Sequence, residues 1–375
     1  MGINEKSAVR ILAIILVTGA FFLAASSCGQ KESKASIGEA TRLLDQGKIH
    51  AATDMLDALI ESDPGAGQLR IVRAKARERV FDFDGSLEDC DFLIAANPDD
   101  AELLEMRGKV RIKAREFDGA QEDLLAASKL KPDSSSIFSS LGLVYFYKSD
   151  FQEARRLFEL SASLDGRNEG PYFGRAAIFV EENDYESAIG EMTNLLKIHP
   201  NNAQALLRRG FSYLKNGDAK KALTDFNKAL EHDADLKEIY WYRAEAHRAL
   251  NEPEMALKDY EKAEHVDPDD AILYLNQGSM LIMMGRYNEA LEKLRRSIVL
   301  DPDNPLPYIN RAALQLQTGN ILASLSDVNK ALEIRSDDPQ LLTKRAYIFK
   351  VMARQDRALE DLDEALKLDP DNLEG

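Results

Sequence analysis

The sequence predicts an all-α solenoid of ten helical hairpins, and three observations carry that prediction. A proline or a small residue recurs every 34 residues without an insertion. Each interval divides into two stretches with the apolar spacing of an amphipathic helix, separated by a short turn. A fixed period of this size is typical of stacked repeats rather than of separate globular domains. The recurring positions are Pro64, Pro98, Pro132, Gly166, Pro200, Ala234, Pro268, Pro302, Ser336 and Pro370.

The first 27 residues have the pattern of a secretory signal peptide. Lys6 and Arg10 precede an apolar run at 11–25, which is shorter than the roughly 20 residues that span a bilayer. Small residues then lead to Cys28, so the segment resembles a bacterial lipoprotein signal, which implies cleavage before Cys28 and acylation of Cys28. Ala25 stands where that family usually has leucine, which leaves cleavage by the ordinary signal peptidase open. We expect an exported chain, anchored to a membrane of the bacterial cell envelope by Cys28 and a short tether at 28–32.

The repeats occupy residues 33–372 when the recurring residue is placed at position 32 of each, and a tail at 373–375 follows. Position 8 is always glycine or alanine, and position 24 is always apolar, which assigns Cys90 to the core. In the repeat at 271–304, Tyr274, Gly278 and Leu281 lie before the turn at Gly285, and Ala290 follows it. This pattern resembles the tetratricopeptide repeat, and the resemblance implies a right-handed superhelix whose first helices line a concave groove.

Arginine and acid vary together inside single repeats, at positions 7 and 23. Each of seven repeats has arginine at position 7 and aspartate or glutamate at position 23, and the other three have neither. We predict a structural ion pair between the two helices of each such repeat. The arginines are Arg73, Arg107, Arg175, Arg209, Arg243, Arg311 and Arg345, and their acids are Asp89, Asp123, Glu191, Asp225, Asp259, Asp327 and Asp361.

Composition and motifs argue against several classes of function. The net charge of −16 disfavours nucleic acid as a partner, because binding DNA or RNA needs a basic surface. The chain has no metalloprotease, P-loop or hydrolase motif, and the FDFDG stretch at 81–85 is interpreted as a turn. The acidic connectors between repeats are interpreted as helix caps rather than metal ligands. We therefore expect no enzyme activity, no cofactor and no metal.

Two consecutive first helices, at 70–79 and 106–115, carry a ladder of basic residues. If the ladder is a binding site, its basic residues contact anionic lipid head groups or an acidic partner near the tether. The favoured alternative is local pairing with Asp82, Asp84, Glu88, Glu116, Asp118 and Glu122, since charges on helix surfaces are usually solvated or paired. The ladder residues are Lys75, Arg77, Arg79, Lys109, Arg111 and Lys113.

Large apolar residues gather on one face of the first helices in repeats 4 to 7, at positions 5, 9 and 12. We expect this face to bind an amphipathic helix or an extended segment of another envelope protein, so that the chain acts as an interaction scaffold in assembly or secretion. The alternative is a transport accessory that holds a small apolar ligand in the groove. The predicted groove residues are Phe146, Phe173, Val180, Leu207, Phe211, Leu214 and Trp241.

Overall fold

The computed structural model describes residues 37–236 and 238–370. It divides into two compact parts, which we call the N-terminal half, up to Ile178, and the C-terminal half, from Phe179. Each half is described separately. Every regular element within the described residues is a helix, which confirms the predicted fold class. The signal peptide, Cys28, the tether and the tail lie outside the described residues.

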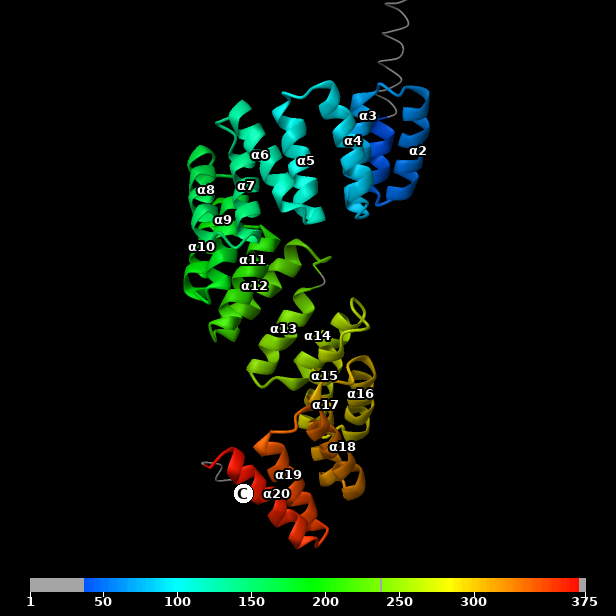
Figure 1. The fold of residues 1–375 in the computed structure, drawn as a ribbon, viewed down its shortest axis with the longest axis vertical. Helices are drawn as coiled ribbons and strands as arrows, with labels where there is room; N and C mark the ends of the chain where they lie inside the picture. The colour runs from blue at the N-terminus through cyan, green and yellow to red at the C-terminus, as the bar shows by residue number, and fades with distance from the viewer. Residues whose placement is uncertain (1–36, 237, 371–375) are drawn as a thin grey trace, which may run out of the picture. The chain divides into compact units, whose positions relative to one another are not determined.

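Each repeat is a pair of antiparallel helices joined by a short turn (Figure 1). The first helices of the hairpins are residues 37–45, α3 (Gly67–Arg79), α5 (Ala101–Ala114), α7 (Ser135–Tyr147), α9 (Gly170–Glu181), α11 (Ala203–Lys215), α13 (Ile239–Ala249), α15 (Ala271–Met283), α17 (Pro305–Gln317) and α19 (Pro339–Val351). The second helices are α2 (Ile49–Ser62), α4 (Phe83–Ala96), α6 (Phe117–Leu130), α8 (Phe151–Leu164), α10 (Tyr185–Ile198), α12 (Ala219–His232), α14 (Pro253–Glu264), α16 (Tyr287–Leu300), α18 (Ile321–Ile334) and α20 (Gln355–Leu368).

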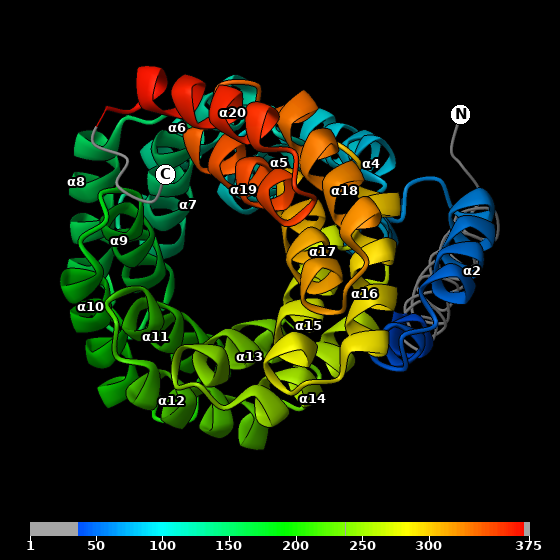
Figure 2. The same cartoon turned by 90° about the horizontal axis from the view of Figure 1, so that it is seen from below.

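The hairpins of the C-terminal half form two layers. Its first helices, α11 to α19, lie on the inner side of an arc, and its second helices, α12 to α20, lie on the outer side (Figure 2). Each of α12, α14, α16 and α18 packs on its own first helix and also on the first helix of the next repeat. The second helices therefore hold consecutive repeats together, and the first helices form the inner layer.

The core is built where the small residue at position 8 faces the apolar residue at position 24. A Cβ atom added to Gly210 would lie 2.6 Å from Cε1 of Phe226, and one added to Gly142 would lie 2.7 Å from Cε1 of Phe158. Both phenylalanines are buried. Cys90 occupies the same position in α4 and is fully buried, and burial raises the pKa of its thiol to about 12. Cys90 is therefore a core residue, as predicted.

The acidic connectors cap the helices that follow them. Asp100 accepts hydrogen bonds from the backbone N–H groups of Glu102 and Leu103, and Asp270 accepts the same pair of bonds at the start of α15. These bonds satisfy backbone donors that have no partner inside the helix. None of the described helices is both long and apolar enough to cross a membrane.

Position 15, in the turn between the two helices, has a left-handed backbone in all ten repeats. Glycine fills it in four repeats, and six repeats have another residue there, including Phe81 with φ of 62° and Arg115 with φ of 65°. A side chain in this region costs about 1–2 kcal/mol for most residues. Because neither Phe81 nor Arg115 is glycine or asparagine, both turns keep backbone strain that the sequence could have avoided.

Replacing Phe81 with glycine is expected to raise the free energy of unfolding by about 1 kcal/mol, because the strain is relieved. Little packing is lost, since Phe81 is 79% exposed. Leu322 is 72% exposed and lies in the first turn of α18, so Leu322→Gly should instead lower the free energy of unfolding, by up to about 1 kcal/mol. Urea unfolding of both variants checks the pair of predictions, and a destabilised Phe81→Gly protein would contradict the first.

Candidate interaction surfaces

The structure brings together six of the seven predicted ion pairs. In each, Nε and Nη2 of the arginine donate to the two carboxylate oxygens of the aspartate over 2.5–2.9 Å. The carboxylates are 0–8% exposed and the arginine side chains 11–26%. The hydrogen bond to Asp225 raises the pKa of Arg209 above its ordinary value. The seventh pair, Arg175 with Glu191, has its partners in different halves and stays a prediction.

Five of these six arginines also bind a residue of the preceding repeat, which the sequence analysis did not predict. Nη1 of Arg73 donates to Asp57 over 2.6 Å, and Nη1 of Arg243 donates to Asn227 over 2.7 Å. Asp91, Thr193 and Asn329 accept equivalent bonds from Arg107, Arg209 and Arg345. All these acceptors lie at position 25, so the arginine joins its own two helices and also ties consecutive repeats together.

Two repeats show what replaces the pair. In repeat 4 both positions hold leucine, and Leu141 and Leu157 are buried. In repeat 8 they hold Gln277 and Lys293, and Nζ of Lys293 lies 2.7 Å from Glu264 of the preceding repeat. A buried apolar pair thus occupies the site in one repeat, and a bond to the neighbouring repeat replaces the internal pair in another.

The predicted groove residues of the C-terminal half include an aromatic row. The ring centroids of Phe211 on α11 and Tyr242 on α13 are 5.3 Å apart, and those of Tyr242 and Trp241 are 5.4 Å apart, both edge to face. Nζ of Lys215 lies 5.6 Å from the centre of the Phe211 ring. Phe211 and Trp241 are half-buried. Tyr242 and Lys215 are members that the sequence reasoning missed, because only positions 5, 9 and 12 were considered.

The other predicted groove residues fall in both halves. Phe146 and Phe173 belong to the N-terminal half and are half-buried, while Val180 and Leu214 in the C-terminal half are also half-buried. Leu207 is buried, so it contributes to packing rather than to an open surface. A continuous groove across repeats 4 to 7 remains a prediction.

Most of the basic ladder is paired locally. Arg77 and Arg111 each pair with an aspartate on the second helix of their own repeat. Nη1 of Arg77 lies 3.3 Å from Asp89, and Nη1 of Arg111 lies 2.7 Å from Asp123. Nη1 of Arg79 donates to the carbonyl oxygen of Leu44 over 3.1 Å.

The lysines of α5 have acidic partners on first helices. Nζ of Lys109 lies 2.5 Å from Glu105, and Lys113 pairs with Glu78. Of the six acids expected to neutralise the ladder, Asp82 approaches Arg77 at 3.6 Å and Glu116 approaches Arg111 at 3.7 Å. Lys75 has no such partner among the described residues.

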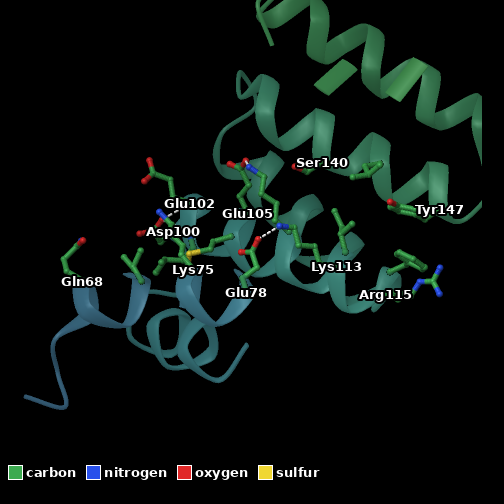
Figure 3. Close-up of a pocket in the computed structure, with 17 residues that line it drawn as sticks. Gln68, Lys75, Glu78, Asp100, Glu102, Glu105, Lys113, Arg115, Ser140 and Tyr147 are labelled. Carbon is green, nitrogen blue, oxygen red and sulfur yellow. Dashed lines mark hydrogen bonds and ion pairs between the residues drawn. The ribbon is translucent and has the colours of Figure 1, made fainter. Parts of the chain in front are cut away.

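A hollow of about 830 Å³ lies over α3, α5 and α7 in the N-terminal half. Its floor is apolar, with Ile71, Met106, Ile112 and Leu143, and its rim carries Lys75 and other charged residues. Figure 3 shows Arg115 and Tyr147 at one end and Gln68, Asp100 and Glu102 at the other. The hollow contains three residues of the predicted basic ladder, Lys75, Lys109 and Lys113, but the sequence did not predict the hollow itself. Across the described residues, no group of three or more His, Cys, Asp or Glu side chains could hold a metal ion.

Comparison with known families identifies the repeats directly. Family models described as tetratricopeptide repeat match residues 105–168 and 203–236, and one described as TPR repeat matches residues 278–319. No curated protein is significantly similar to the chain.

The solved structures that are similar to the chain match only part of it. A tetratricopeptide repeat protein from Parabacteroides merdae is 19% identical over 71% of this chain and 98% of its own, with a TM-score of 0.47. PilF of Pseudomonas aeruginosa is 18% identical over 56% and 96%, with a TM-score of 0.48. YrrB, described as a TPR protein with an unusual peptide-binding site, is 22% identical over 49% and 95%, with a TM-score of 0.45. From the matched ranges and the hairpins described above, the chain contains tetratricopeptide repeats, and its fold is an α-solenoid built from them.

Proposed function

We propose that the chain is a non-enzymatic interaction scaffold, which binds a segment of another envelope protein on the inner face of its first helices. The observation that carries this proposal is the aromatic row of Phe211, Tyr242 and Trp241. Large rings in contact with each other but only half-buried are the residues that most often dominate the free energy of binding at interfaces. Tetratricopeptide repeats support a scaffold role, since stacked hairpins leave an extended surface rather than an enclosed active site.

The proposal places the scaffold at a membrane of the cell envelope. The signal pattern at 1–27 and the cysteine that follows it support export and acylation of Cys28. More than one acyl chain is needed for stable attachment, which the family's usual modification supplies. The tether between Cys28 and the first helix would then hold the repeats close to the membrane surface.

Photo-crosslinking in cells of the source organism tests the proposal. A crosslinking residue at Lys215, which lies beside the Phe211 ring, should trap one envelope protein. The matched control is Leu322, which is exposed on α18 in the outer layer and should not trap that protein. Equal trapping at both positions, or none at Lys215, would contradict a partner site on the inner face.

The alternative function is a transport accessory that holds a small apolar ligand, and native mass spectrometry distinguishes it from the scaffold. The scaffold predicts that the purified chain has the mass of its polypeptide and any lipid on Cys28. An additional small molecule that is lost in the Trp241→Ser variant would favour the transport role instead.

A further inference from the structure

The hollow over α3, α5 and α7 is separate from the aromatic row and uses none of its residues. Its volume of about 830 Å³ lies within the range of ligand sites in proteins. The helices α3, α5 and α7 are the first helices of three consecutive repeats, and at about 10 Å between neighbouring axes they span roughly 20 Å, the length of about six extended residues. The dimensions therefore fit a short extended segment of a protein.

The acidic side chains that line the hollow already form ion pairs or hydrogen bonds within the protein. Glu78 pairs with Lys113, and Glu105 lies 2.5 Å from Nζ of Lys109. Glu102 lies 2.6 Å from Nζ of Lys131. Asp100 accepts the backbone N–H groups at the start of α5. Each acid thus has a partner within the protein.

Two basic side chains of the same hollow form no such bonds among the described residues. Lys75 on α3 and Arg115 at the end of α5 are both exposed, and neither has an ion-pair or hydrogen-bond partner for its charged group among the described residues. The lining has four basic and four acidic side chains, but the two cations without a partner leave uncompensated positive charge at Lys75 and Arg115. Complementary charge on a partner both steers the encounter and fixes its orientation.

The Arg115 end of the hollow also offers an aromatic platform. Tyr147 stacks on Phe117 with centroids 5.1 Å apart and an interplanar angle of 18°, yet Tyr147 is 47% exposed. A second hollow of about 430 Å³ adjoins this pair and also contacts Arg115. Tyr147 and Arg115 line the same end of the hollow, and tyrosine and arginine are enriched among interface hot spots.

We propose that this hollow is a second binding site, which takes an acidic, extended segment of a partner protein. Carboxylates of the segment contact Lys75 and Arg115, and an aromatic side chain packs on Tyr147 and Phe117. A membrane surface fits less well, because these groups line a concavity between helices that a flat bilayer does not enter. The site is independent of the inner-face site of the C-terminal half.

Fluorescence anisotropy with the purified full chain tests the inference. The probe is a labelled peptide of glutamates around one tyrosine, about six residues long. It should bind saturably, whereas a peptide with lysines in place of the glutamates should not. The Lys75→Glu, Arg115→Glu double variant should weaken binding at least about tenfold, and Tyr147→Ser should weaken it while leaving the binding of a serine-containing acidic peptide unchanged.

Controls separate this site from general charge effects. Lys129→Glu makes the same charge change at an exposed residue of α6 outside the hollow and should leave the affinity unchanged. Trp241→Ser should also leave it unchanged, so failure of this site and failure of the inner-face site can be told apart. No saturable binding, an equal loss in Lys129→Glu, or retention by phosphatidylglycerol vesicles that depends on Lys75 and Arg115 without peptide binding would overturn the proposal.

Discussion

Asp225→Ala is expected to lower the free energy of unfolding by about 3–5 kcal/mol, because it leaves a largely buried arginine charge without its partner. Asp225 is only 4% exposed and accepts two hydrogen bonds from Arg209, over 2.7 and 2.8 Å. The remaining bond from Arg209, to the hydroxyl of Thr193 over 3.2 Å, cannot compensate a full charge. Removing the acid alone should therefore cost far more than an exposed salt bridge is worth, which is at most about 1 kcal/mol.

Replacing both partners by leucine should restore most of the lost stability. Repeat 4 already has this arrangement, with Leu141 and Leu157 buried at the same two positions. Exchange of a buried ion pair for apolar residues of similar volume is often neutral or stabilising. Urea unfolding measures the change, and hydrogen exchange of α11 and α12 shows whether the loss is local to that repeat. A double-leucine protein as unstable as Asp225→Ala would contradict this explanation.

Gly210→Ala is expected to lower the free energy of unfolding by about 1–3 kcal/mol, although alanine is the better helix former. The added Cβ would lie 2.6 Å from Cε1 of Phe226, whose ring is fully buried, so the ring or the helices must shift. Repeats with alanine at position 8 have other residues at position 24, such as Ala40 with Leu56. Phenylalanine occurs at position 24 only opposite glycine, in Gly142 with Phe158 and in Gly210 with Phe226.

The second substitution Phe226→Leu should relieve that clash. Phe226→Leu alone leaves a cavity and should be destabilising, but together the two changes should cost less than the sum of the single changes by at least about 1 kcal/mol. A double-mutant cycle by urea unfolding measures this coupling. Simple additivity would mean that the helices separate to accept the alanine.

The repeats could be predicted from the sequence because equivalent positions pack in the same way in every copy, which produces the 34-residue period. A residue at position 8 or 24 meets the same neighbour in every copy, so the same size constraint recurs at intervals of 34 residues. The ion pairs were predictable for a related reason, since Arg209 and Asp225 face each other within one hairpin and their types vary together along the chain.

Other features of the structure are marked less clearly in the sequence. The acceptors at position 25 are aspartate in two repeats, asparagine in two and threonine in one, because any oxygen acceptor can accept the bond from the arginine. The left-handed turn at position 15 tolerates Phe81 and Arg115, so glycine does not mark it. Predicting the hollow as a binding site requires knowing which charges are unpaired. Lys109 has an ion-pair partner and Lys75 has none among the described residues, and only the positions of their neighbours show this difference.

The most direct test of the central claim is the affinity of the crosslinked partner for a chain with both Phe211→Ser and Trp241→Ser. Titration calorimetry with the purified partner should show a loss of at least about 100-fold, or roughly 2.7 kcal/mol, while the circular dichroism of the variant matches that of the original chain. An unchanged affinity in a folded variant, or a variant that no longer folds, would contradict the claim that these rings form a binding surface.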